Sequence, residues 1–216
     1  MSAAVADDVR RGWGFDPTVI PNGVDAERFS AAAESGRTHW QEKFGRYVLA
    51  VGGIEPRKGS LDLLDAFSRL ADRNLRLVFA GGETLFDYRD YRAEFDVRAT
   101  ELAVEPVILG TVDDDELPHL VAQAAVLPFF STKEGFGLAA MEALAASTPV
   151  VARDLPVLRE VFGDSVTYAS SVGSMATELE RAVREPRDRL PGLALARSLT
   201  WDEAARRHLE FYSSLR

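Results

Sequence analysis

Short apolar runs alternate with longer segments of helical character over most of this chain, and this alternation is the feature that most constrains its fold. The apolar runs span residues 47–51, 75–80, 107–110, 125–130, 150–152 and 165–168. Each is almost continuously apolar, as strands are when helices cover both faces of a parallel sheet. The alternation predicts an α/β fold with a Rossmann-like, doubly wound parallel sheet, in which ligands bind beyond the carboxyl ends of the strands.

No internal repeat, linker or low-complexity tract interrupts the 216 residues, so we expect a single domain over 1–216. The elements expected outside the alternation are a helix at 3–11, a strand at 18–20, a turn at 21–25, a helix at 37–44 and a loop at 186–192. C-terminal helices should follow, because Thr200 and Glu203 form the capping-box pattern that starts a helix.

The stretch 133–145 carries the most specific chemical pattern in the chain. Two carboxylates flank a glycine–aromatic–glycine turn, and an alanine- and leucine-rich segment that should be helical follows. The unpaired N–H groups of a helix start, approached through glycines, make a good seat for a phosphate. The residues expected to contact a ligand here are Glu134, Gly135, Phe136, Gly137, Leu138 and Glu142.

The spacing within this stretch suggests which molecule carries the phosphate. A helix rises about 1.5 Å per residue, so Glu142 should lie roughly 7 Å along the axis from Gly137. That is about the distance between a diphosphate and a ribose. Because Glu134 lies on the other side of the turn, we expect a nucleotide-sugar to place its sugar at Glu134, its diphosphate at the helix start and its ribose at Glu142.

A second candidate phosphate loop follows the first apolar run. It contains Gly53, Arg57 and Lys58 and precedes a helix expected at 61–70. A strand, a glycine-bearing loop with two cations and a helix form an arrangement suited to phosphate. The glycine spacing matches neither a P-loop nor the G-x-G-x-x-G dinucleotide fingerprint. The alternative is that Arg57 and Lys58 are solvated loop charges.

Two further strand ends complete the predicted ligand-binding edge of the sheet. Gly81 and Gly82 follow one apolar run, while Thr111 and Val112 follow the next and are placed to meet a nucleotide base. The three aspartates at 113–115 resemble a metal-binding pattern, but they directly precede a helix. Aspartate at that position caps unpaired N–H groups and favours the helix dipole, so we expect no metal site.

The composition excludes several classes of function. Lys and Arg number 25 against 34 Asp and Glu, a net charge of −9 that gives no general footprint for nucleic acid. The chain has no cysteine and only three scattered histidines, so disulfides and thiolate or histidine metal sites are not expected. No apolar run approaches a membrane span and the N-terminus is no signal peptide, which predicts a cytoplasmic location.

The two glutamates eight positions apart around Gly-Phe-Gly, with Thr148-Pro149-Val150-Val151 after them, resemble the paired-glutamate signature of retaining, family-4 type glycosyltransferases with a GT-B fold. The resemblance implies that Glu134 touches hydroxyls of the donor sugar, that Glu142 holds the ribose and that Lys58 binds the donor diphosphate. It also implies an α/β, Rossmann-like domain that is one half of a GT-B fold.

The resemblance covers residues 19–215 and matches only the C-terminal, donor-binding half of such an enzyme. The chain is therefore expected to be an excised domain whose partner is the missing N-terminal, acceptor-binding domain of the same enzyme. Its last helix resembles the one that braces that domain. Any association with a membrane would come only through the missing half.

The resemblance implies retaining transfer of a hexosyl group from a UDP-, GDP- or ADP-linked sugar, with no metal or other cofactor. Lys58, Arg57 and the helix start would stabilise the departing diphosphate, and Glu134 would orient the sugar. Many members carry an arginine where this chain has Gly53, so we expect Arg57 to replace it. The fragment alone should be inactive. The alternatives are a nucleotide-sugar epimerase of similar fold and a stand-alone nucleotide-binding module.

Overall fold

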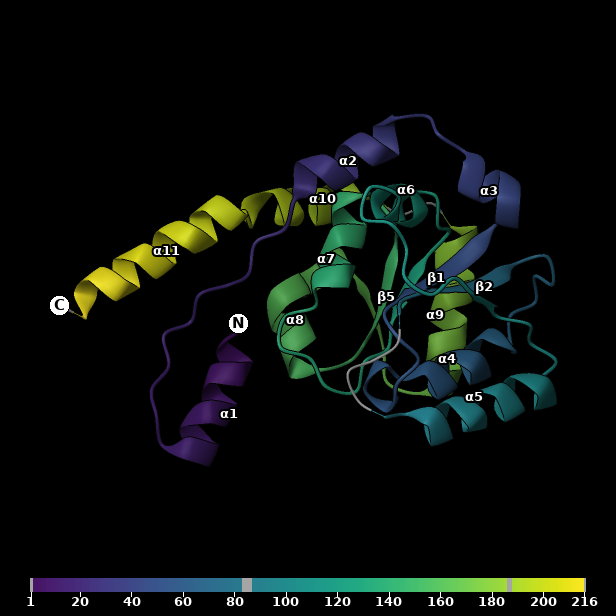
Figure 1. Cartoon of the computed structure of the whole chain (residues 1–216), viewed down its shortest axis with the longest axis horizontal. Coiled ribbons are helices and arrows are strands. Elements are labelled where there is room, and N and C mark those ends of the chain that lie inside the picture. The colour runs from purple at the N-terminus through teal and green to yellow at the C-terminus, as the bar shows by residue number, and fades with distance from the viewer. Residues whose placement is uncertain (1, 83–86, 186–187, 216) are drawn as a thin grey trace.

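The strands form two parallel, three-stranded sheets in a computed structural model that describes residues 2–82, 87–185 and 188–215 (Figure 1). The first sheet has the order β1-β2-β3 and the second β4-β5-β6. Their strands are β1 (Tyr47–Val51), β2 (Arg76–Ala80), β3 (Val107–Ile108), β4 (Leu127–Phe129), β5 (Val150–Arg153) and β6 (Thr167–Ala169). Each strand begins within a predicted apolar run, because these runs supply the residues that both helical layers bury.

A narrow seam joins the two sheets where β1 meets β4. Val48 and Val126 form an isolated parallel bridge. The Leu49 N–H donates to the Val126 carbonyl at 3.1 Å, and the Ala125 N–H donates to the Tyr47 carbonyl at 2.8 Å. The strands therefore follow the spatial order 3-2-1-4-5-6 of a doubly wound Rossmann fold, and the order of successive strands reverses at this seam. The predicted fold class is confirmed.

Alternate strand residues face two separate apolar cores, as the two-residue period of a strand requires. On β1, Tyr47 and Leu49 face one core and Val48 faces the other. The first core is completed by α2 (Ala26–Glu34), α3 (His39–Phe44), α6 (Leu117–Ala122), α7 (Leu138–Ala145), α8 (Pro156–Phe162) and α10 (Leu190–Ser198). The second is completed by α4 (Ser60–Phe67), α5 (Arg89–Glu101) and α9 (Val172–Arg184). Figure 1 shows the strands between these helices.

Some expected elements differ in the structure. Residues 18–20 are not part of a strand in the described chain, so the predicted strand is wrong. Helix α2 was not predicted. The loop expected at 186–192 is wrong from Leu190 onward, because α10 begins there; residues 186–187 lie outside the described residues.

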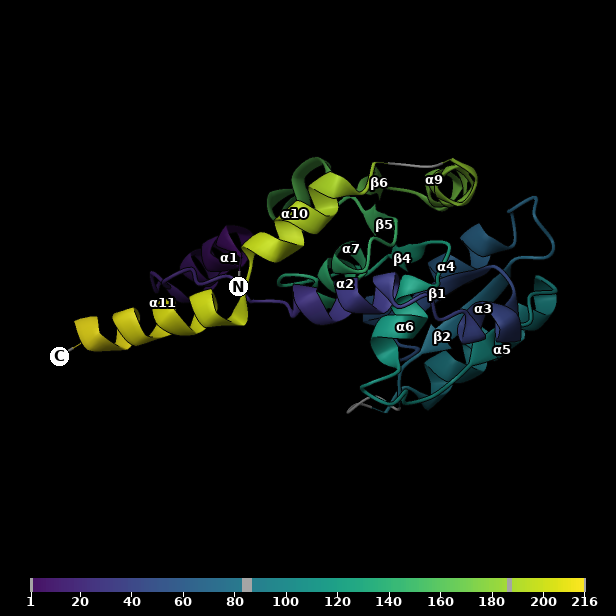
Figure 2. The ribbon, with the colours of Figure 1, turned by 90° about the horizontal axis from the view of Figure 1, so that it is seen from above.

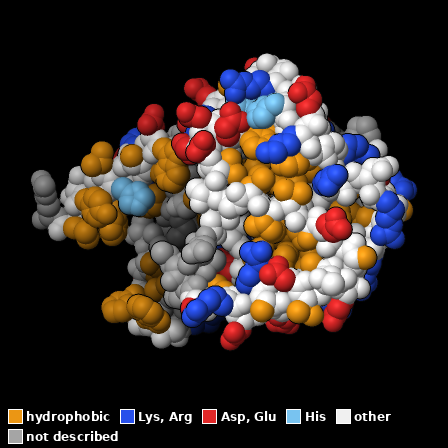
Figure 3. All heavy atoms as spheres, turned by 45° about the vertical axis from the view of Figure 1, so that its right-hand side comes forward, with side chains coloured by type: hydrophobic (Ala, Val, Ile, Leu, Met, Phe, Trp, Pro, Cys, Tyr) orange, Lys and Arg blue, Asp and Glu red, His pale blue; other side chains and the backbone are white. Residues whose placement is uncertain are grey.

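Two terminal helices extend away from the sheet on the same side of the molecule (Figures 1 and 2). They are α1 (Ala3–Trp13) and α11 (Trp201–Ser214). The Thr200 hydroxyl accepts from the Glu203 N–H at 3.2 Å, which is one half of the predicted capping box, while the Glu203 carboxylate accepts from Arg206 and Arg207 instead. Figure 3 shows hydrophobic side chains gathered on the projecting part. None of the described helices combines the length and apolar character needed to cross a membrane.

Candidate functional site

An open cleft lies at the carboxyl ends of β1 and β4, beside the seam where the strand order reverses. It encloses about 570 Å³, within the range typical of small-molecule sites. The loop after β1, the loop after β4 and the first turns of α7 provide most of its walls. Its lining residues are Asn22, Val51, Gly52, Arg57, Lys58, Phe129, Glu134, Gly135, Phe136, Gly137, Leu138, Ala139 and Glu142.

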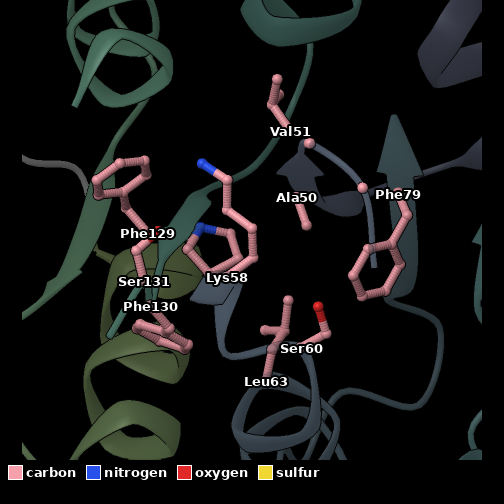
Figure 4. A pocket seen from close by; sticks show the side chains of 12 residues that line it. Ala50, Val51, Lys58, Ser60, Leu63, Phe79, Phe129, Phe130 and Ser131 are labelled. Carbon is pink, nitrogen blue, oxygen red and sulfur yellow. The ribbon is translucent and has the colours of Figure 1, made fainter. Parts of the chain in front are cut away.

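The loop after β1 carries Lys58 into the cleft across a glycine. Gly52 has a φ of 122°, and a Cβ there would lie 3.1 Å from the Lys58 Cε. Gly59, with a φ of 66°, passes so close to β4 that a Cβ would lie 2.3 Å from the Phe130 carbonyl oxygen. The Lys58 ammonium ends 5.5 Å from the centre of the Phe129 ring, and Figure 4 shows it directed toward that side of the cleft.

Two cations of this loop share one carboxylate from the loop after β4. The Glu134 Oε1 accepts from Arg57 Nη1 at 3.0 Å and from Lys58 Nζ at 3.2 Å. Arg57 Nη2 also donates to Glu55 Oε1 at 2.8 Å, and Glu55 is only 8% exposed. The Arg57 carbonyl accepts from the Thr132 N–H at 2.8 Å. These contacts hold both cations at the wall of the cleft, with the Lys58 side chain 22% exposed and the Arg57 side chain still 45% exposed.

The start of α7 forms the floor of the cleft. Gly137 has a φ of 100°, and a Cβ there would lie 3.0 Å from the Phe162 ring and 3.2 Å from the Phe129 ring. No side chain caps the helix. Its first N–H groups are therefore available to an anion in the cleft.

Glu142 lies one turn further along α7 and also lines the cleft. Burial raises the pKa of its carboxyl group to about 7, the Arg28 guanidinium lowers it and the Asp114 carboxylate raises it. Arg28 and Asp114 form an ion pair of 2.9 Å. Sequence reasoning missed Arg28, because only the packing of α2 brings it to this position.

Five predicted contact residues do not line the cleft. Gly81 instead permits a close approach between strand ends, since a Cβ there would lie 2.2 Å from the Gly52 carbonyl carbon. A Cβ at Gly82 would lie 2.6 Å from the Thr111 hydroxyl. Val112 packs against the first core. Gly53 lines a separate, smaller cavity.

That smaller cavity lies beneath Lys58 and is drawn in Figure 4. Its volume of about 20 Å³ is enough for a single water molecule. The Ser131 hydroxyl lies at its wall, is 1% exposed and has no hydrogen-bond partner among the described residues. Such a buried, unpaired hydroxyl is the kind of group that an internal water satisfies.

The aspartates at 113–115 do not cap α6 through their side chains. The N-cap residue is Glu116, which has no side-chain cap, and its N–H donates to the Asp113 carbonyl at 2.9 Å. The predicted aspartate side-chain cap is therefore wrong. Over residues 2–82, 87–185 and 188–215, no group of three His, Asp or Glu side chains is arranged to hold a metal ion.

The comparison with protein families decides the class of the chain. The model of the family described as "Glycosyl transferases group 1" matches residues 37–189. The chain belongs to this family. It is 31% identical to the phosphatidyl-myo-inositol mannosyltransferase of Mycobacterium tuberculosis H37Rv over 98% of the chain and 59% of that protein. It is 35% identical to the glycogen synthase of the same strain over 87% of the chain and 44% of that protein.

Solved structures agree with this group 1 glycosyltransferase fold. Anabaena Alr3699/HepE in complex with UDP-glucose has a TM-score of 0.84 at 21% identity, over 99% of this chain and 62% of that one. A glycosyltransferase from Rickettsia africae ESF-5 has a TM-score of 0.79 at 16% identity, again over 99% and 62%. The group 1 glycosyltransferase chain thus has a GT-B, Rossmann-like fold and spans about half the length of the curated relatives it matches.

Proposed function

We propose that the chain is the donor-binding part of a retaining glycosyltransferase that takes a hexosyl group from a nucleotide-diphosphate sugar. The observation that carries the proposal is the order of groups along one cleft. Arg57, Lys58 and Glu134 form one cluster in the cleft wall, the uncapped start of α7 follows Glu134 along the chain, and Glu142 lines the cleft one turn further along that helix. A sugar, a diphosphate and a ribose need these groups in this order.

The diphosphate is assigned to Arg57, Lys58 and the first N–H groups of α7. A guanidinium, an ammonium and a helix start all favour phosphate oxygens, and the guanidinium can bind two of them at once. Arg57 would supply the cation that is absent at Gly53. The direction of Arg57 toward Glu134, at 3.0 Å, supports this assignment because it places the guanidinium on the cleft side of the loop.

The remaining parts of the donor are assigned to the two glutamates and to the end of β3. Glu142 would accept hydrogen bonds from the ribose hydroxyls, and Glu134 would accept them from the sugar. Thr111 and Val112 lie outside the cleft walls but remain the proposed neighbours of the base. The Anabaena protein of similar fold is solved in complex with UDP-glucose, which supports a nucleotide-sugar as the ligand class.

The proposed chemistry breaks the bond between the anomeric carbon and the diphosphate oxygen and forms a bond from that carbon to an acceptor oxygen, whose proton is released. Negative charge grows on the departing diphosphate. Lys58, Arg57 and the α7 start would stabilise that charge because they are already held in place. Glu134 would orient the sugar. Membership of the group 1 glycosyl transferases favours transfer over epimerisation.

An acceptor-binding domain is the proposed partner of this chain. The chain covers 59% of its mycobacterial mannosyltransferase relative, so a large part of that protein has no counterpart here. The exposed apolar side chains on α1, the segment after it and α11 offer a surface for such a domain. Its identity would determine the acceptor and any membrane contact.

Calorimetric titration with UDP, GDP and ADP tests donor binding. We expect one of them to bind and Glu142→Ala to weaken that binding by about 1.5–3 kcal/mol, the value of a charge-assisted hydrogen bond. A parallel assay should detect no sugar transfer by the chain alone. Failure of all three nucleotides to bind would contradict the donor site, whereas robust transfer would contradict the need for a partner domain.

A further inference from the structure

We propose that Glu134 occupies the diphosphate position in the empty protein and acts as an internal competitor that the donor must displace. The inference rests on the proposed function, since it assigns the two cations of the cleft to a diphosphate. It adds a property of that site: one carboxylate changes partners, from the cations to the sugar, when the donor binds.

The first step is the sharing of a single oxygen atom. Glu134 Oε1 lies 3.0 Å from Arg57 Nη1 and 3.2 Å from Lys58 Nζ, so it stands between the two cations as a phosphate oxygen would. The side chain of Glu134 is only 10% exposed in this position, against 22% for Lys58 and 45% for Arg57. Among the described residues that line the cleft, Arg57 and Lys58 are the only cations. A diphosphate therefore finds both of its cations already paired.

The second step is that contacts outside the cluster hold the two cations in place, whereas the described residues provide no such contact for the Glu134 side chain. Arg57 pairs with the buried Glu55 at 2.8 Å, and its carbonyl accepts from the Thr132 N–H at 2.8 Å. Lys58 lies against the Phe129 ring. Glu134 is followed by the exposed Gly135, where a Cβ would meet nothing nearer than 4.0 Å. Among the described residues, the hydrogen bonds of the Glu134 side chain go to Arg57 and Lys58 alone, so the carboxylate is the member of the cluster that the other two hold.

The consequence concerns the difference between substrate and product. When phosphate oxygens take both cations, Glu134 loses its partners, and only a ligand that carries a sugar offers it new ones. A nucleoside diphosphate without sugar displaces Glu134 and leaves a poorly solvated carboxylate beside two phosphates. The cluster should therefore weaken binding of the product relative to the donor and favour product release.

The test is a titration of wild type and Glu134→Gln with UDP, GDP, ADP and inorganic pyrophosphate. Glutamine keeps the shape but removes the charge that competes for the cations. We expect Glu134→Gln to bind the nucleoside diphosphate roughly three- to tenfold more tightly, equivalent to about 0.7–1.4 kcal/mol. Pyrophosphate should show the same gain, because it lacks base, ribose and sugar. Unchanged or weaker binding would overturn the inference.

Glu55→Gln is the matched control, since it removes a carboxylate from the same guanidinium but leaves Glu134 in place. If the loss of any negative charge near Arg57 tightened ligand binding, both variants would bind equally more tightly. That result would refute competition between Glu134 and the diphosphate. The proposal requires the gain in Glu134→Gln alone, in protein with native circular dichroism. If wild type binds and Glu134→Gln gains nothing, only this inference is wrong; if no variant binds any ligand, the donor site itself is wrong.

Discussion

At the scale of single residues, the ionisation of Glu142 couples the cleft to the stability of the fold. Burial raises the pKa of this carboxyl group from an ordinary 4.5 to about 7. Between these two pH values the folded protein holds a proton that the unfolded chain has released. The free energy of unfolding contributed by this group therefore falls as the pH rises from 4.5 to 7, and the loss is complete above 7.

Glu142→Gln should remove this pH dependence, because an amide does not ionise. We expect the variant and the wild type to unfold with similar free energies near pH 4.5. At about pH 8 the variant should be more stable by on the order of 2 kcal/mol, a value reduced from the full shift for partial solvent access. Urea denaturation at both pH values measures the difference. An equal difference at the two pH values would contradict the raised pKa.

Arg57→Ala tests whether this side chain replaces the cation absent at Gly53. We expect diphosphate affinity to fall by about 1.5–3 kcal/mol, measured by calorimetric titration. We also expect Arg57→Ala to lower stability, because it removes the partner of the buried Glu55. A second change, Glu55→Gln, should restore stability without restoring affinity. Unchanged affinity in Arg57→Ala would leave Lys58 as the working cation.

The sequence predicted the types of site residue better than their pairings. Arg57, Lys58, Glu134 and Glu142 were expected from glycine-bearing loops beside strands, and they do lie along one cleft. Their contacts could not be predicted, because Arg57 and Glu134 are 77 residues apart in the chain. The role of Glu55 likewise depends on burial that no local pattern reveals.

At the scale of elements, α7 depends on a glycine at its start. Gly137→Ala would place a Cβ against two aromatic rings and in a left-handed conformation, with a φ of 100°. Gly36→Ala is the matched control, since Gly36 has a φ of 67° but open space around its Cβ. We expect the control to lose about 1 kcal/mol of stability and Gly137→Ala to lose roughly 2–4 kcal/mol. Equal losses in urea denaturation would show that the rings move aside.

The strands and most helices could be predicted because burial on both faces leaves a continuous apolar run, which is visible in one sequence. The segment at 18–20 has the same β-branched character, yet it forms no strand in the described chain. Helix α2 escaped notice because its pattern is short and its fold depends on packing against α6 and α7. Local propensity is a weak guide where tertiary contacts decide.

At the scale of the whole molecule, the two terminal helices expose apolar side chains that the sheet domain does not cover. Trp13 is 78% exposed and Phe15 68%, while on α11 Leu209 is 67% and Tyr212 59% exposed. Large exposed apolar patches on globular proteins commonly mark interaction sites. This surface lies on the side of the molecule where both terminal helices project (Figures 1 and 2).

Replacing Leu209 and Tyr212 by serine should reduce self-association of the isolated chain without changing nucleotide affinity. Analytical ultracentrifugation over a range of concentrations measures the first effect and calorimetry the second. The control is serine at Leu190, which is 71% exposed on α10. An equal reduction of self-association in the control would mean that general hydrophobicity, and not the α11 surface, governs association.

The seam between the two halves of the sheet has a mechanical consequence. Arg57 and Lys58 follow β1, whereas Glu134 follows β4, so a ligand that touches the cations and the α7 start spans the seam. Bound diphosphate should therefore slow hydrogen exchange at the seam amides of Leu49 and Ala125, while the amide of Val24, which pairs with Leu199, serves as a remote reference. Exchange that is unaffected at the seam would contradict this. If exchange does slow, the bound donor acts as a cross-link between the two three-stranded sheets. The fraction of protein with donor bound would then set how strongly the two sheets resist being pulled apart.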